Sequence, residues 1–168
     1  LRIPWWAKSA QVRINGGKPD SIPRGGFYHS IERLWHDGDE VVLTIPMTVR
    51  LEQGHPYTSN TGRVAVCRGP LVYCLEQVDN PLVNIFDVHL NPNSSFEARL
   101  DEHLLDGVVV LTTNAVVVAP NRWHADPYVP YSSTPAAETD THTVTMIPYY
   151  AWANRGNHAM NVWIPVAP

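Results

Sequence analysis

The chain has 168 residues and a net charge of −4, and 44% of its residues are apolar while only 17% are charged. This length suits one domain or two very small ones, and it is long enough to bury a core. The Lys and Arg residues form no concentrated basic patch and no apolar run reaches the length of a membrane span, which argues against nucleic acid binding and against a transmembrane segment.

The first third of the chain is typical of short strands separated by turns. Residues 11–14 alternate apolar and polar, and the Asn-Gly pair that follows is a strong hairpin signal. Residues 18–26 are predicted to form a loop, and residues 27–35 the next strand. The clearest strand signal covers residues 41–51, where every odd-numbered residue is apolar. Pro46 lies on the opposite face, so we expect an edge strand or a bend there.

Two consecutive segments in the middle of the chain, residues 64–67 and 71–75, are apolar at every position. They are too short for ordinary helices and rich in β-branched residues, and a strand that is apolar on both faces is covered on both faces. The Arg68-Gly69-Pro70 segment between them must bend or bulge, because proline cannot donate to a β-ladder. We predict that these strands lie in the middle of a β-sandwich, with Val66 and Val72 inside.

The second half continues in the same way. Residues 96–100 alternate, and residues 107–119 hold two Val-rich runs that fit either a hairpin or one long bent strand. Residues 142–150 and 160–164 give the last strands. The irregular stretch 121–141 is long for a compact domain, and such loops are functional or mobile. The sequence therefore predicts an all-β fold: an antiparallel two-sheet, jelly-roll-like β-sandwich of about ten strands with little or no helix, as a single domain over residues 1–168.

No arrangement of residues in the sequence points to a reaction centre. Cys67 and Cys74 could pair only if the bend brought their Cα atoms within about 7 Å. We favour two buried thiols that pack as small hydrophobic side chains. The eight histidines lack the close spacing of metal ligands, and we predict no metal site. No nucleophile elbow or phosphate-binding loop is present, so no catalytic residue is predicted.

Acidic residues gather at two places. The two carboxyl groups of a glycoside hydrolase could be drawn from such clusters, although a pairing across strands cannot be read from sequence. Both clusters flank predicted turns, where acids are expected for turn chemistry. The clusters are Asp37, Asp39 and Glu40, and Asp101, Glu102 and Asp106.

Aromatic residues lie mostly in predicted loops and at strand ends. Flat rings exposed on a sandwich can stack against sugars, and they can equally cap the sandwich or cover an interface with another domain. We favour the cap or interface. The residues are Trp5, Trp6, Trp123, Tyr128, Tyr131, Tyr149, Tyr150 and Trp152.

Four stretches carry a resemblance to a known family: residues 1–7 (Leu-Arg-Ile-Pro-Trp-Trp-Ala), residues 35–39 (Trp-His-Asp-Gly-Asp), residues 62–76 around the Arg-Gly-Pro bend, and residues 147–156 (Ile-Pro-Tyr-Tyr-Ala-Trp-Ala-Asn-Arg-Gly). Together they resemble the region after the catalytic barrel in glycoside hydrolase family 127, the β-L-arabinofuranosidase-like proteins. The resemblance implies a β-sandwich packed against an (α/α)6 barrel. In that family the barrel holds the catalytic acids and the cysteine ligands of a zinc ion.

None of the family's catalytic or zinc-binding positions matches this chain, so the resemblance implies no catalytic residue and no zinc here. It implies a piece of a larger chain, with an edge strand missing or borrowed, because relatives have further sandwich strands before the segment that matches Leu1. Zinc is expected only in the absent catalytic domain. No secretory signal is visible, and the compartment is left open.

Three functions follow as hypotheses. The first is a non-catalytic accessory β-sandwich of a bacterial glycoside hydrolase, whose partner is the catalytic barrel and which could contribute a loop to the rim of the sugar pocket. The second is a carbohydrate-binding module for a plant-type oligosaccharide. The third is a structural or adhesive surface domain that self-associates through an open sheet edge. The candidate sugar or domain-interface contacts are Trp123, Tyr128, Tyr131, Tyr149, Tyr150, Trp152 and Arg155.

Overall fold

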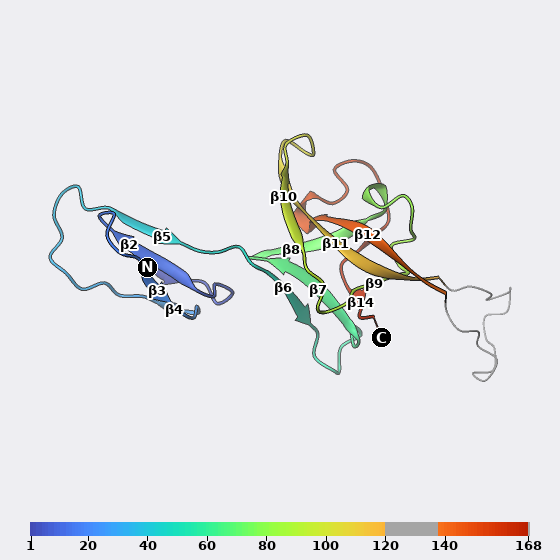
Figure 1. The fold of residues 1–168 in the computed structure, drawn as a ribbon, viewed down its shortest axis with the longest axis horizontal. Coiled ribbons are helices and arrows are strands. Elements are labelled where there is room, and N and C mark those ends of the chain that lie inside the picture. Colours follow the sequence, from blue (N-terminus) through green and yellow to red (C-terminus); the bar gives the residue numbers. More distant parts are fainter. Residues whose placement is uncertain (120–137, 168) are drawn as a thin grey trace. The chain divides into compact units, whose positions relative to one another are not determined.

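The computed structural model describes residues 1–119 and 138–167, which divide into two compact units. Unit 1 consists of Leu1–Val49 and Arg68–Pro70, and unit 2 consists of Arg50–Cys67 and Leu71–Pro168. The helical elements within the described ranges are two 3₁₀ turns, η1 (Gln77–Asp79) and η3 (Tyr149–Ala151), and strands make up the rest of the regular structure (Figure 1). The all-β fold class is confirmed. The single domain over residues 1–168 stays a prediction.

Unit 1 contains two small antiparallel sheets. In the first, β1 (Arg2–Ile3) pairs with β4 (Phe27–Tyr28). In the second, β2 (Ala10–Ile14) lies between β3 (Asp20–Ile22) and β5 (Val41–Thr44). The turn after β2 has positive φ at both Asn15 and Gly16, 50° and 69°, and it closes with Gly17 N donating to Ile14 O at 2.9 Å, which is the predicted hairpin turn.

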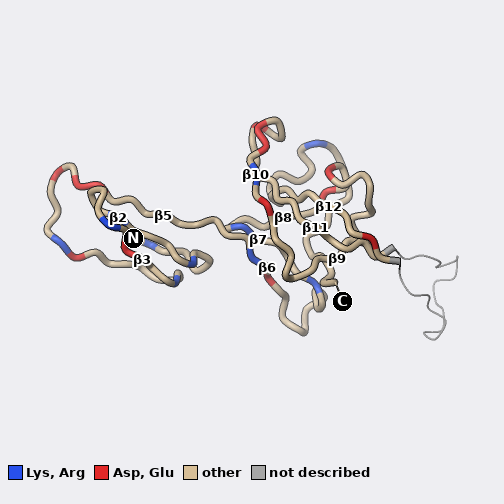
Figure 2. Tube along the Cα trace, in the orientation of Figure 1, with Lys and Arg blue, Asp and Glu red and all other residues tan. Residues whose placement is uncertain are grey.

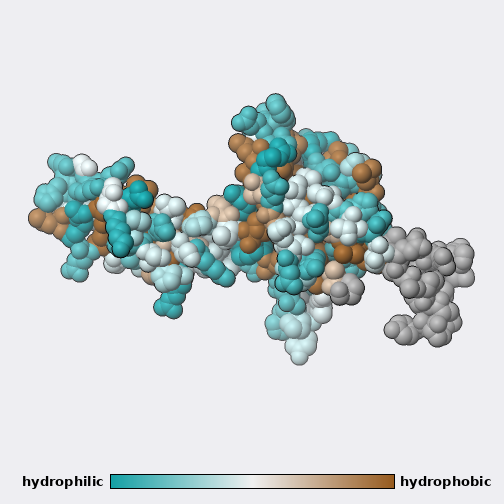
Figure 3. Space-filling model, in the orientation of Figure 1, coloured by the Kyte–Doolittle hydropathy of each residue, from teal (hydrophilic) through white to brown (hydrophobic). Residues whose placement is uncertain are grey.

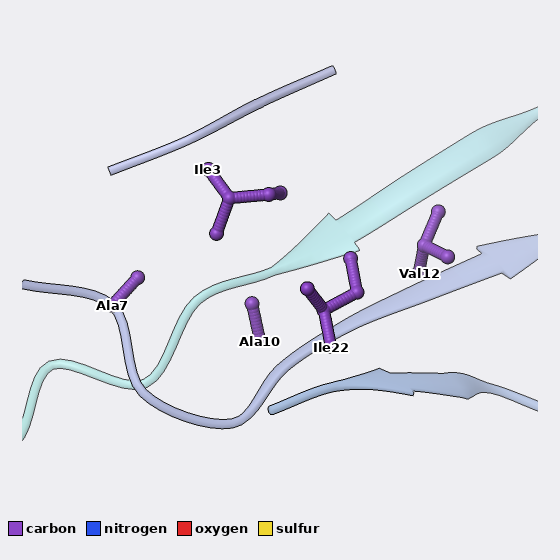
Figure 4. Packing of buried hydrophobic residues seen from close by; sticks show 5 residues of the cluster. All are labelled: Ile3, Ala7, Ala10, Val12 and Ile22. Carbon is purple, nitrogen blue, oxygen red and sulfur yellow. The ribbon is translucent and has the colours of Figure 1, made fainter. Parts of the chain in front are cut away.

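The core of unit 1 is small. Alternation along β2 turns Ala10 and Val12 inward and leaves Gln11 and Arg13 exposed, as the period of two predicts. The side chains from the surrounding segments converge on these two residues (Figure 4). The buried cluster consists of Ile3, Ala7, Ala10, Val12 and Ile22, and Trp6, Ile31, Val41, Leu43 and Ile45 pack against it.

The structure differs in part from three predictions for the first third of the chain. The strand expected over residues 27–35 was wrong beyond β4, because its apolar residues recur every fourth position and not every second. The predicted loop over residues 18–26 contains β3. The strand expected over residues 41–51 divides at the predicted bend around Pro46 into β5 and β6 (Val49–Gln53).

Unit 2 is organised around one large antiparallel sheet with the order β10-β11-β12-β8-β7-β14. Residues 107–119 were expected to form either a hairpin or one long strand. The long strand is confirmed, because β11 is one strand of 12 residues. Three more strands attach to this path: β6 to β7, β9 to β11 and β13 to β8. The bounds are β7 (Arg63–Arg68), β8 (Leu71–Glu76), β9 (Val88–His89), β10 (Glu97–Asp101), β11 (Val108–Ala119), β12 (Glu138–Pro148), β13 (Met160–Asn161) and β14 (Ile164–Pro165).

The hydrogen-bonded path of unit 2 closes between β14 and β9, which pairs with β11, and leaves β10 outside the closed part. Leu90, directly after β9, forms a bridge with Val166, directly after β14; Leu90 N donates to Pro165 O and Ala167 N to Leu90 O, both at 2.8 Å. Because β9 pairs with β11 and β14 pairs with β7, strands on opposite sides of the unit are joined into a sandwich-like enclosure. The strands β7, β8, β9, β11, β12 and β14 of this closed path each contribute a fully buried side chain: Val66, Tyr73, Leu75, Val88, Leu111, Met146 and Ile164.

The central strands are covered on both faces, as their sequence predicts. On β8, Tyr73 and Leu75 alternate with Cys74, and Cys74 belongs to a second buried cluster with Val108, Val110, Ile147 and Ala151. Val66 is fully buried. The expectation for Val72 was wrong: it lies on β8, but 37% of its surface is exposed. The second buried cluster covers this face of β8 at Cys74 and leaves Val72, near the start of the strand, exposed.

His89 lies where the path closes, and it gives unit 2 a pH dependence. Burial lowers the pKa of His89, opposed by the charge of Asp87, and its Nδ1 atom is buried without a partner among the described residues. A histidine pKa that is lower in the folded state contributes stability above the unfolded value of about 6.5, and this contribution is lost as pH falls below it. We expect urea unfolding between pH 7 and pH 5 to show a smaller loss of stability in His89→Gln than in the unchanged chain; identical pH profiles would contradict this.

Candidate functional site

The aromatic turn, residues 149–158, gathers the predicted contact residues that the structure describes. It begins with η3 after β12 and leads into β13, and in Figure 1 it arches back beside the 3₁₀ turn η1 that follows β8. Tyr149, Tyr150, Trp152 and Arg155 all lie on it. Trp123, Tyr128 and Tyr131 fall outside the described residues.

An ion cluster ties the aromatic turn to the end of β8. The Arg155 guanidinium donates to both carboxylate oxygens of Asp79, each at 2.6 Å, and to Oε2 of Glu76 at 2.5 Å. The side chain of Glu76 is fully buried, and those of Asp79 and Arg155 are 13% and 20% exposed. The hydrogen bonds that Arg155 donates to Asp79 and then to Glu76 raise the pKa of Arg155 above its ordinary value, against the effect of burial, so the guanidinium stays charged.

Two atoms of this cluster are buried without a hydrogen-bond partner among the described residues, Oε1 of Glu76 and Nε of Arg155. Taking charged groups out of water costs free energy that an ion pair recovers only with good geometry, and an unsatisfied buried polar atom adds to that cost. The cluster therefore fixes a geometry more than it adds stability.

Neighbouring side chains hold both ends of the cluster in place. Asn80, next to Asp79, is 5% exposed; its Nδ2 donates to Glu76 O and Thr145 O, and its Oδ1 accepts from Thr145 N, all at 2.9 Å. The side chain thus continues the β8–β12 pairing past the pair Leu75–Met146. Gln77 N donates to Ala159 O at 2.9 Å and so joins η1 to the end of the aromatic turn.

The aromatic turn is also fixed from within. Asn154 Nδ2 donates to Ala151 O at 3.0 Å, and a ring nitrogen of His158 lies 3.2 Å from Arg155 O. The backbone takes positive φ values of 64° at Ala153 and 114° at Gly156, which turn the chain sharply. These contacts and the ion cluster together define the shape of the loop.

The rings on this turn are exposed although their backbone is anchored. Tyr149 and Trp152 stack with nearly parallel planes, 8° apart, at a centroid distance of 6.1 Å. Tyr149 is 46% exposed and Tyr150 is 65% exposed, and on η1 Val78 is 41% exposed. Both segments that the ion cluster joins therefore present apolar surface to solvent.

The remaining titratable groups serve structure. Cys67 and Cys74 are both free and buried, as predicted. Burial raises the pKa of Cys67, and burial with the nearby charge of Glu76 raises that of Cys74 to about 12. Zinc ligation needs thiolates, so these thiols do not fit the zinc that the resemblance places in the barrel. In the part of the chain that the structure describes, no group of three or more His, Cys, Asp or Glu could hold a metal ion.

The two acidic clusters carry out the predicted turn chemistry. Asp39 accepts hydrogen bonds from Asn15 Nδ2 at 2.7 Å and His36 N at 3.0 Å, and these bonds lower the pKa of Asp39. Asp101 accepts from His103 N at 3.1 Å, which lowers its pKa in the same way. Neither aspartate is set up as a general acid, since a general acid must carry a proton near neutral pH.

The rest of the described surface is mixed. Basic and acidic positions are interspersed along the chain (Figure 2), and apolar atoms break the polar surface at separate places (Figure 3). No helix among residues 1–119 and 138–167 could cross a membrane. A cavity of about 380 Å³ in unit 2 is lined by polar side chains and lacks a ring for stacking on a sugar; its lining is Ser94, Ser95, Glu97, Thr112, Thr113, Asn114 and Thr143.

Comparison with known proteins gives a consistent result over the whole chain. Residues 49–165 match the model of the glycoside hydrolase family 127 C-terminal domain, and residues 1–47 match that of the β-L-arabinofuranosidase GH127 middle domain. The chain is similar to a non-reducing end β-L-arabinofuranosidase of Bifidobacterium longum subsp. longum, at 35% identity over an alignment of 173 positions that covers 97% of this chain and 25% of that protein.

Two solved structures of glycoside hydrolases are also similar to this chain. A GH127 β-L-arabinofuranosidase from Geobacillus stearothermophilus T6 is 40% identical with a TM-score of 0.84, covering 99% of this chain and 26% of that one. A second glycoside hydrolase is 32% identical with a TM-score of 0.86, covering 99% and 27%. The chain thus spans about a quarter of the length of the relatives it matches. Because the C-terminal domain model covers most of the sequence, the chain belongs to glycoside hydrolase family 127.

Proposed function

We propose that this chain is a non-catalytic accessory β-sandwich of a β-L-arabinofuranosidase-like glycoside hydrolase and that it braces the catalytic barrel of its parent protein. One observation carries the proposal: the chain matches the middle and C-terminal domain models of the family and spans only a quarter of relatives named as arabinofuranosidases. The zinc that the resemblance assigns to the barrel would belong to the parent protein and not to this chain.

The chemistry of the described residues supports this assignment. A glycoside hydrolase needs two carboxyl groups on either side of the scissile bond, one of them protonated. Here Glu76 and Asp79 share one guanidinium, which occupies the space between them. Asp39 and Asp101 accept backbone hydrogen bonds at turns. The acidic side chains best placed to act together are therefore engaged in structure.

A bracing role fits the way in which unit 2 is built. Its sheet closes on itself, and its core side chains come from every strand of the closed path. Each strand of a closed path has a hydrogen-bonded neighbour on both sides. A rigid body of this kind can hold the position of a neighbouring domain without supplying any reacting group.

The proposal is tested by assaying the purified chain on aryl β-L-arabinofuranosides. We expect no hydrolysis above that of a buffer blank. Turnover that stays with the protein through successive purification steps would contradict the proposal. Binding of arabinan oligosaccharides to the isolated chain in calorimetry would favour a carbohydrate-binding module in its place.

A further inference from the structure

The geometry of the aromatic turn points to its partner. We infer that Tyr149 and Tyr150, with Val78 of η1, form the surface on which the catalytic region of the parent protein docks, and that the Glu76–Asp79–Arg155 cluster holds this surface in its docking shape. The inference rests on the proposed function and goes further by naming the contact residues.

The ion cluster joins two segments that lie far apart in the sequence. Arg155 reaches carboxylates that lie 76 and 79 positions away in the sequence, and Glu76 is fully buried with one oxygen unsatisfied. Apolar side chains of similar volume in place of the whole cluster are often at least as stable, because a buried ion pair rarely improves on good apolar packing. What the cluster does supply is a fixed distance between η1 and the aromatic turn.

The two segments that the cluster joins expose apolar side chains to solvent. Tyrosines supply large contact areas at small entropic cost, and they are enriched among the residues that dominate protein interfaces. Tyr150 is 65% exposed and Tyr149 46%, yet their backbone is held by the contacts of Asn154, His158 and Arg155. A surface that is ordered before binding avoids the entropic cost of ordering on association.

The occupant is a protein surface and not a sugar. Trp152 covers one face of the Tyr149 ring, so the two rings of this pair do not both lie open for a sugar. About three quarters of the length of the relatives lies outside the matched region. A neighbour on the same chain is present at a high effective concentration, so a small apolar surface is enough to hold it.

The test uses the Geobacillus relative with its matching region exchanged for this chain, and compares this exchange protein with the isolated chain by hydroxyl-radical footprinting. We expect the reactivity of Tyr149 and Tyr150 to fall at least about fivefold in the exchange protein, since side chains in an interface core lose nearly all contact with water. Tyr57, which is 95% exposed in a loop of unit 2, is the internal control and should keep its reactivity.

Two substitutions at Arg155 test whether the ion cluster positions the tyrosine rings. In the exchange protein, Arg155→Ala should restore the reactivity of Tyr150, and Arg155→Lys, which keeps a cation beside Glu76 and Asp79, should regain part of the protection. An exchange protein that hydrolyses arabinofuranosides while Tyr150 stays as reactive as in the isolated chain would overturn the inference and leave the proposed function standing. An exchange protein without that activity would count against the proposed function itself.

Discussion

Replacing Arg155 with alanine is expected to lower the free energy of unfolding of unit 2 by about 3 kcal/mol, because removing one partner of a buried ion pair leaves its charge uncompensated. Here two carboxyl groups lose their cation, and Glu76 cannot move to water because its side chain is fully buried. Urea unfolding followed by the near-ultraviolet circular dichroism of the stacked Tyr149 and Trp152 measures the effect at the cluster itself.

The matched control is Arg99→Ala. Arg99 also pairs with an aspartate, Asp101, at 3.2 Å, but its side chain is 62% exposed. Exposed ion pairs of this kind contribute between about 0 and 1 kcal/mol. Equal losses of stability in the two variants would show that the burial of the Arg155 cluster has no energetic consequence, and would remove the basis for a positioning role.

Gly25→Ala is expected to unfold unit 1 or destabilise it by about 3 kcal/mol or more, at the upper end of the usual cost of overpacking. An added Cβ at Gly25 would overlap the carbonyl oxygen of Pro4, and it would lie 2.8 Å from the Pro4 carbonyl carbon and 2.9 Å from Ala7 O. All three are backbone atoms, so none can swing aside. A unit with so small a buried cluster has little stability to lose.

Gly16→Ala is the control for this variant. Gly16 has a positive φ of 69°, but nothing lies within 4 Å of an added Cβ there. Only backbone strain of about 1–2 kcal/mol is expected. Hydrogen exchange of the β2 amides, Ala10–Ile14, compares the two variants. Faster exchange in Gly16→Ala than in Gly25→Ala would mean that the close approach of Gly25 to Pro4 does not hold unit 1 together.

The local sequence pattern was sufficient to predict a strand where the strand is long and uniformly buried. Residues 64–67 and 71–75 are apolar at every position, and the strands β7 and β8 that they form are covered on both faces over most of their length. The bend at Pro46 follows from a missing donor. Such features depend on the residue and its near neighbours, which the sequence displays directly.

Pattern failed where pairing is short or distant. The two-residue strand β9 carries no periodicity, and residues 160–164, predicted as one strand, divide into β13 and β14. Over residues 27–35 the pattern predicted too long a strand. Apolar residues four positions apart were taken for one face of a strand, but only β4 forms there.

Part of the candidate site could be predicted from the sequence. The aromatic residues of the turn at 149–152 were predicted as contacts, and Arg155 was included with them. The sequence did not point to Glu76 and Asp79 as the partners of Arg155, because an ion pair between residues 76 or more positions apart leaves no local signal. The one available hint was an acidic residue, Glu76, at the end of a strand that is otherwise apolar.

The most direct test of a bracing, non-catalytic role is the rate of aryl β-L-arabinofuranoside hydrolysis by the purified chain, measured beside the exchange protein that joins it to the rest of the Geobacillus relative. We predict that the isolated chain is inactive and that the exchange protein is active. Hydrolysis by the isolated chain, persisting after purification and lost on its denaturation, would contradict this account.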